Sequence, residues 1–220
     1  MSSMIDVLRR LNRRALNNWI TDGDDFSADT RDATPEQVWR STARGDRLLY
    51  LIDALVDERV LDRQWLSLAT VSAAETVLKY IPASEIRPRR ALNVARSFAR
   101  GDASEAEVVV AADYAHACYV SFVNSPERDR FVAQAEAAYA AHVAGRIAQD
   151  PPRHRDWTAA VAVYVANAYA HAKLGGGASP DDTTRAFEES HARVARAVRR
   201  AVPWLTVSAA IDRLEARDRR

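Results

Sequence analysis

The segment SEAEVVVAADYAHACYVSFVN, residues 104–124, decides the fold of this chain. Alanine and valine dominate it, and Ser104 stands three residues before Glu107, which is the spacing of a helix capping box. Small side chains let helix axes approach closely, while Tyr114 and Tyr119 supply apolar area and a polar tip that reaches the surface. The segment therefore predicts a helix that packs tightly against its neighbours.

The same segment holds a histidine and the only cysteine of the chain. His116 and Cys118 are two residues apart, so on a helix they point to different faces and cannot form a nucleophile pair. His142 or His171 could approach the thiol from a neighbouring helix. A lone cysteine in an alanine-rich helix is typically a small buried apolar residue, so we interpret this segment as a packing element.

Helical periodicity extends outward from this segment to both ends of the chain. In ALNVARSFARG, for example, Leu92, Ala95 and Phe98 lie on one face at 3.6 residues per turn, and strand-like alternation is missing. The pattern predicts an all-α single domain, residues 1–220, folded as a compact multi-helix bundle or curved helical array of about nine or ten helices. The expected helices are residues 4–20, 35–44, 46–57, 61–80, 88–100, 105–123, 126–149, 155–174, 180–201 and 206–218.

Local signals mark the ends of these helices. Thr34 and Gln37 form a second capping-box pattern, and Pro35 suits the first turn of the helix that follows. Serine followed by proline predicts two further starts, and glycine predicts two helix ends in the left-handed conformation. These positions are Ser125, Ser179, Gly101 and Gly175.

Charge and cysteine content exclude several classes of protein. Lys and Arg number 31 against 30 Asp and Glu, a net charge of +1, so no long-range field would gather the chain onto nucleic acid or anionic lipid. One cysteine cannot form an internal disulfide, which favours a cytoplasmic location. No segment reaches the roughly 18 uncharged apolar residues of a membrane helix, so we expect no membrane contact. Residues 22–34 are strongly acidic and predict a solvated linker after the first helix, or an acidic surface for a basic partner.

Two acid-x-x-His pairs offer the sharpest catalytic alternative. Asp113 with His116, and Glu188 with His191, match the local geometry of di-iron helix bundles, and Glu136 could supply another carboxylate. Acidic residues occupy 30 of 220 positions, so such pairs also arise by chance. No phosphate-binding lysine motif, nucleophile elbow, paired CxxC or HExxH is present. We therefore expect no catalytic residue, metal or cofactor, and keep a metal-dependent helical-bundle enzyme as an alternative.

Arginines gather in two predicted helices. RPRRALNVARSFAR at 87–100 and HARVARAVRR at 191–200 would carry stripes that contact phosphates or an acidic protein. The other interpretation is that they are solvated faces balanced by nearby carboxylates. Which stripe faces a partner stays open at this point.

Two segments resemble a known family. PEQVWRSTARGDRLLYLIDAL at 35–55 and YIPASEIRPRRALNVARSFARGDAS at 80–104 are similar to immunity proteins of bacterial polymorphic-toxin systems. The shared features are a tryptophan-bearing helix, an Arg-Gly-Asp turn and an Arg-Pro-Arg helix start. Arg47 departs from the aromatic residue that such sequences often place after Gly-Asp. Asp46 is a credible N-cap for the helix after this turn.

The resemblance implies a non-enzymatic protein-binding protein that neutralises a toxin or effector by covering a functional surface. Aromatic and arginine residues commonly anchor such interfaces. The expected partner-binding residues are Trp39, Arg47, Tyr50, Arg87, Arg89 and Arg90. A structural or oligomeric scaffold of phage or mobile-element origin, built as a homo-oligomer on the alanine-rich faces, is a further alternative.

Overall fold

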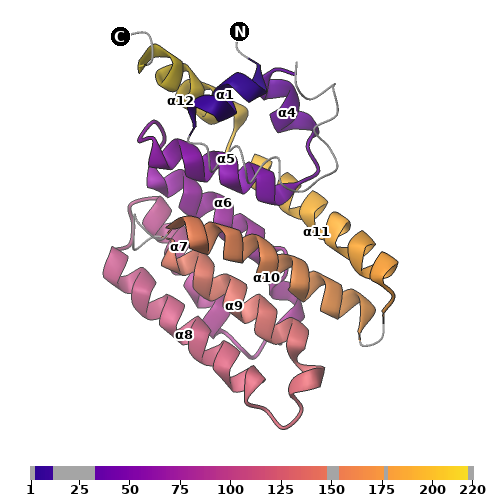
Figure 1. Cartoon of the computed structure of the whole chain (residues 1–220). Coiled ribbons are helices and arrows are strands. Elements are labelled where there is room, and N and C mark those ends of the chain that lie inside the picture. The colour runs from indigo at the N-terminus through magenta and orange to yellow at the C-terminus, as the bar shows by residue number, and fades with distance from the viewer. Residues whose placement is uncertain (1–2, 12–32, 148–153, 176–177, 218–220) are drawn as a thin grey trace.

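A computed structural model describes residues 3–11, 33–147, 154–175 and 178–217 of the chain. These residues form ten α-helices and two 3₁₀ turns, with no strand among them, which confirms the all-α prediction (Figure 1). The helices are α1 Met4–Arg10, α4 Pro35–Ser41, α5 Gly45–Asp57, α6 Arg63–Glu75, α7 Arg87–Ala99, α8 Glu105–Val123, α9 Val132–Arg146, α10 His154–Leu174, α11 Pro180–Ala201 and α12 Trp204–Arg217. The 3₁₀ turns are η1 Leu78–Tyr80 and η2 Arg128–Arg130.

Most of the predicted helix ends are confirmed. The Ser104 hydroxyl accepts from the Glu107 amide at 3.3 Å, and the Glu107 carboxylate accepts from the Ser104 amide at 2.7 Å, which closes the predicted capping box of α8. Thr34 and Gln37 do the same at the start of α4. Gly101 has φ +82°, the left-handed conformation that ends a helix.

Four local predictions need correction. The segment expected as one helix over 61–80 breaks after Glu75 into the 3₁₀ turn η1, and α9 begins at Val132 because the chain after Ser125 makes a 3₁₀ turn first. Asp46 is not an N-cap, since α5 already begins at Gly45. The first helix ends at Arg10, and residues 12–32, which include most of the predicted acidic linker, lie outside the described residues.

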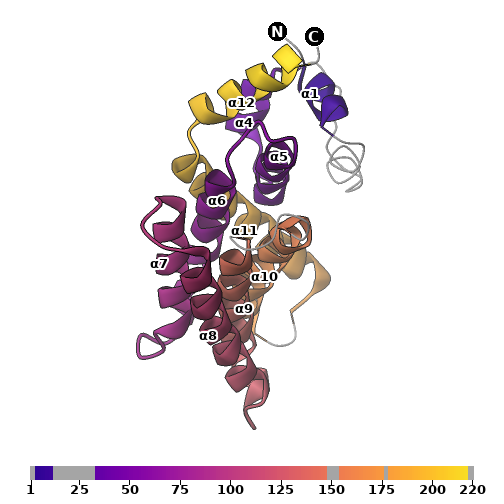
Figure 2. The ribbon, with the colours of Figure 1, turned by 90° about the vertical axis from the view of Figure 1, so that its left-hand side faces the viewer.

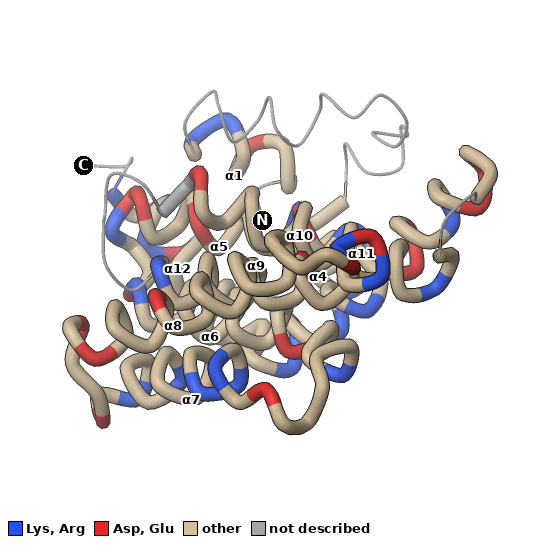
Figure 3. Tube along the Cα trace, turned by 90° about the horizontal axis from the view of Figure 1, so that it is seen from below, with Lys and Arg blue, Asp and Glu red and all other residues tan. Residues whose placement is uncertain are grey.

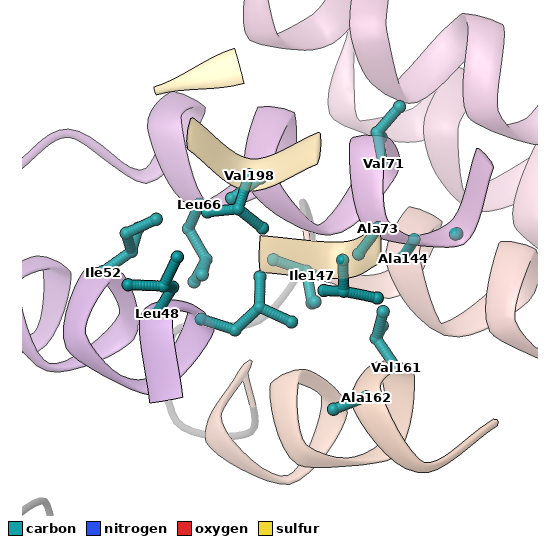
Figure 4. Close-up of a cluster of buried hydrophobic side chains, with 14 of the residues drawn as sticks. Leu48, Ile52, Leu66, Val71, Ala73, Ala144, Ile147, Val161, Ala162 and Val198 are labelled. Atoms are coloured by element: carbon teal, nitrogen blue, oxygen red, sulfur yellow. The ribbon is translucent and has the colours of Figure 1, made fainter. Parts of the chain in front are cut away.

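Helix α6 lies at the centre of the structure. It packs against α5 on one side and α7 on the other, and also contacts α9, α10 and α11 (Figure 2). The helices α8, α9 and α10 form a layer in which α9 lies between the other two. One cluster of buried apolar side chains joins these elements, with Leu48, Leu66, Ile147, Val161 and Val198 meeting between α5, α6, α9, α10 and α11 (Figure 4).

Small residues allow the closest helix contacts. A Cβ atom on Gly45 would lie 2.5 Å from Cβ of Val194, so α5 and α11 touch through the bare glycine. A Cβ atom on Gly145 would lie 2.8 Å from Cβ of Ala112, and this contact brings α9 against α8. Beside it, Nδ1 of His142 donates a hydrogen bond to the Ala112 carbonyl oxygen at 2.9 Å, because a carbonyl can only accept.

Arginines near the C-terminus tie the last helices to the first ones. Arg199 on α11 donates to the carbonyl oxygens of Trp39 and Thr42, which the end of α4 leaves without intrahelical partners. Arg213 on α12 donates twice to the Val60 carbonyl oxygen, at 2.7 and 3.0 Å. These charge-assisted bonds hold α4 and the α5–α6 connection against α11 and α12.

Replacing Gly45 with alanine tests the α5–α11 contact. Gly45→Ala forces the helices apart, so we expect the free energy of unfolding in urea to fall by about 1–3 kcal/mol. Backbone entropy alone predicts the opposite sign, a gain of about 0.4–1 kcal/mol. Val194→Ala removes the Cγ1 atom that an alanine at position 45 would meet. The double variant should therefore lose less free energy of unfolding than the sum of the losses in the two single variants. Unchanged or increased stability of Gly45→Ala would contradict the close contact.

Candidate partner-binding surfaces

The predicted binding residues on α4 and α5 lie largely inside the protein. Trp39 is 2% exposed and stands 6.3 Å from Trp204, ring centroid to centroid, in the contact between α4 and α12. Arg47 is 7% exposed, and Tyr50 is half-buried. Trp39 and Arg47 are therefore buried and do not offer an exposed anchor to a partner.

The predicted residues at the start of α7 have different surroundings. Arg87 is bound by the Glu85 carboxylate at 2.6 Å. Arg89 donates to four backbone carbonyl oxygens of the η1–α7 connection, those of Leu78, Ile81, Pro82 and Glu85. Arg90 keeps an exposed side chain. Arg89 thus holds the turn before α7 together.

The six predicted residues do not share one surface. Trp39, Arg47 and Tyr50 belong to α4 and α5, whereas Arg87 and its neighbours belong to α7, and α6 lies between α5 and α7 (Figure 2). The sequence could not show this separation, because it depends on how α6 packs between the two segments.

The two acid-x-x-His pairs also lie apart. Asp113 binds Arg146 at 2.6 Å on the α8–α9 contact. His191 lies on α11, with Nδ1 3.5 Å from Asp46, and Glu188 is exposed. Helix α8 packs on α7 and α9, whereas α11 packs on α5, α6 and α10. Within the described ranges no three His, Cys, Asp or Glu side chains are grouped to hold a metal ion, so the di-metal geometry does not form there.

Aromatic rings and two histidines fill the layer of α8, α9 and α10. Tyr139 lies 4.7 Å from Tyr119, 4.4 Å from Tyr164 and 5.4 Å from His142, ring centroid to centroid. His116 stands 4.8 Å from His142. Rings at these distances are in direct contact, so the cluster is a packing feature that crosses all three helices.

Cys118 has no features of a nucleophile. Its side chain is fully buried, and burial together with the neighbouring Glu85 carboxylate raises the pKa of the thiol to about 12. The predicted role as a small buried residue is confirmed.

A cleft of about 790 Å³ opens between η1, α9, α10 and α11. The lining mixes apolar residues with polar ones, which are Tyr80, Asp129, Arg130, Gln134, Asn167, His171 and Thr183. The Gln134 Oε1 atom is buried and has no hydrogen-bond donor among the described residues. Sequence reasoning did not identify this cleft, because its walls come from segments that are distant along the chain.

The outer side of α8 is uncovered and exposes several apolar residues beside the polar Asp113 and His116. Val110 is 54% exposed and Tyr114 51%, and Val120 and Val123 are also exposed. By length and composition alone α8 could cross a membrane, which the sequence expectation did not foresee, and it is the single described helix with that property. One such helix is weak evidence for a membrane span, because core helices of other proteins share it. Its open face is instead a candidate surface for a partner.

Comparison of the chain with models of protein families, with curated proteins and with solved structures finds no match. The function is therefore argued from the structure and the chemistry of its surfaces.

The buried thiol gives a direct test of the packing role of Cys118. Because its pKa is raised to about 12, almost no thiolate exists at pH 8 and the side chain is shielded from solvent. We expect the native protein to react with a disulfide reagent only as fast as it unfolds, and to react fully in concentrated guanidinium chloride. Rapid reaction of the native thiol would contradict the buried position.

His142 predicts a pH dependence of stability. Burial lowers the pKa of the imidazole below its usual 6.5, so protonation favours the unfolded chain. Its stabilising contribution is complete above about pH 6.5 and is lost as pH falls below that value. His142→Asn keeps a donor for Ala112 without a titrating group, and should lose less stability than wild type between pH 7.5 and 5.0 in urea unfolding. The exposed His171→Asn variant should behave as wild type; a wild-type profile for His142→Asn would contradict the assignment.

Proposed function

We propose that this chain is a non-enzymatic, cytoplasmic protein-binding protein that neutralises a toxin or effector by covering one of its functional surfaces. The observation that carries the proposal is the outer face of α8, defined by Val110, Tyr114, Ala117 and Val120. All four residues are exposed, and they follow one another at helical spacing. The resemblance of residues 35–104 to immunity proteins supports the same class of function.

The physical reason is the composition of α8. A helix as rich in apolar residues as α8 normally lies inside a protein, whereas α8 packs on α7 and α9 with one side only. Burying apolar surface contributes about 25 cal/mol per Å², and exposed tyrosine is a frequent anchor in protein interfaces. A partner that covers Tyr114 and the valines around it would bury this surface. The proposal takes that partner to be a toxin or effector protein, which needs no catalytic group on this chain.

Two variants with equal starting exposure test the proposal. Val110 on α8 and Val163 on α10 are both 54% exposed, and α9 separates the two helices. The protein is mixed with the purified toxin-like product of a gene adjacent to its own, and affinity is measured by titration calorimetry. We expect wild type and Val163→Arg to bind alike and Val110→Arg to bind at least about tenfold more weakly. Thermal unfolding of each variant checks that the fold is intact.

Two results would contradict the proposal. The first is the absence of any association with the adjacent toxin-like protein, or equal weakening by both variants. The second is a stable homo-oligomer of wild type in solution that Val110→Arg converts to a monomer, because the face would then serve a scaffold of identical chains.

A further inference from the structure

A second exposed surface lies where α11 crosses the end of α6. Arg193, Arg196 and Arg200 follow one another on α11 at intervals of three and four residues, so they share one side of the helix. Lys79 lies on η1, the turn that follows α6 and contacts it, and its ammonium lies over the Tyr80 ring. All four side chains are exposed. We call this group, Lys79, Arg193, Arg196 and Arg200, the basic seam.

The seam contains a hollow of suitable size for a side chain. A cavity of about 330 Å³ opens between α6 and α11. Its lining consists of Arg200, Ser72, Glu75, Thr76 and small alanines of α11, and the Thr76 hydroxyl already donates to the Ala73 carbonyl oxygen at 2.7 Å. The Arg200 guanidinium and the Ser72 hydroxyl are donors for a carboxylate, and the Glu75 carboxylate of the lining is paired with Arg96, so the hollow can take the end of an acidic side chain.

Most other arginines in the described part of the chain have a carboxylate partner in direct contact, and the four cations of the seam do not. No carboxylate lies within 4.0 Å of any of them among the residues that the structure describes. Arg193 instead lies over the Tyr169 ring and Lys79 over the Tyr80 ring, each at 5.0 Å. The stacked rings leave the edges of these cations free to donate further hydrogen bonds.

Several arginines elsewhere are already bound within the protein. Arg87 is bound by Glu85, Arg96 by Glu75, and Arg199 by backbone carbonyl oxygens. Figure 3 shows basic positions on both α7 and α11, and among the described residues the seam arginines on α11 have no carboxylate within 4.0 Å. A net charge of +1 over the whole chain conceals this local excess.

Carboxylates within the seam indicate which anion it would accept. Glu75 lines the hollow, and Glu189 stands one turn before Arg193, held by Lys173 and Tyr169. These negative charges interrupt the track of cations that a continuous phosphate backbone would need. Separate acidic side chains can pair with single arginines and avoid the interruptions.

We infer that the basic seam binds an acidic segment of a protein, with carboxylates paired to Arg193, Arg196 and Arg200 and one side chain seated in the hollow beside Ser72. The seam lies on α6, η1 and α11, whereas the face proposed above belongs to α8, which packs on α7 and α9. The inference therefore stands independently of the proposed function.

The test uses an octaglutamate peptide labelled with a fluorophore and measures its binding by anisotropy at low salt. Arg193→Gln/Arg200→Gln removes two charges from the seam. Arg128→Gln/Arg185→Gln removes two exposed charges elsewhere and serves as the matched control. We expect the seam variant to bind the peptide at least about tenfold more weakly than wild type, and the control to stay within about twofold. Circular dichroism confirms that both variants are folded.

Three results would overturn the inference. The first is that octaglutamate does not bind wild type. The second is that both double variants lose affinity equally, which would show that binding depends on net charge and not on the position of the arginines. A 20-base-pair DNA duplex could bind more tightly than the peptide through the same two arginines, which would assign the seam to nucleic acid. None of these outcomes depends on the partner of α8.

Discussion

The architecture depends on the short distances between helices that alanine and glycine permit. Helix α6 touches five other helices, and Ala69, Ala73 and Ala74 on it have no exposed surface. Gly45 and Gly145 create two further contacts in which a single Cβ atom would meet a neighbouring helix. Protein interiors are packed to crystal-like density, so larger residues at these points would displace whole helices. The rest of the fold is arranged around these contacts.

The position of α8 follows from this packing. A central α6 and a three-helix layer place α8 at the edge, where α7 and α9 cover one side of it. Its alanines satisfy the close contacts, and the same apolar composition continues onto the uncovered side. The apolar composition of α8 therefore serves two purposes. It allows close packing on α7 and α9, and on the uncovered side it forms the surface that we propose a partner covers.

Arginine has two distinct uses in this protein. Arg89, Arg199 and Arg213 donate to backbone carbonyl oxygens and connect segments that are distant in the sequence. Arg193 and Arg200 stay exposed and lack counter-ions among the described residues. The planar guanidinium suits both uses, since it can bridge several carbonyl oxygens or pair with a carboxylate. Charge counts along the chain do not separate the two groups, although their roles are opposite.

The sequence by itself determined the helical class, most helix ends and the packing role of Cys118, because 3.6-residue periodicity and capping boxes act within one or two turns. The Ser104–Glu107 box is an example of such a local signal. Only the tertiary structure decided that Trp39 is buried, that the Asp113 and His191 pairs lie apart and that Arg193, Arg196 and Arg200 have no carboxylate partner among the described residues. These properties arise from contacts between residues far apart in the chain, such as Arg199 with Trp39 across 160 positions. Side-chain exposure and ion pairing are set by which helices meet, and that information appears only when the chain has folded.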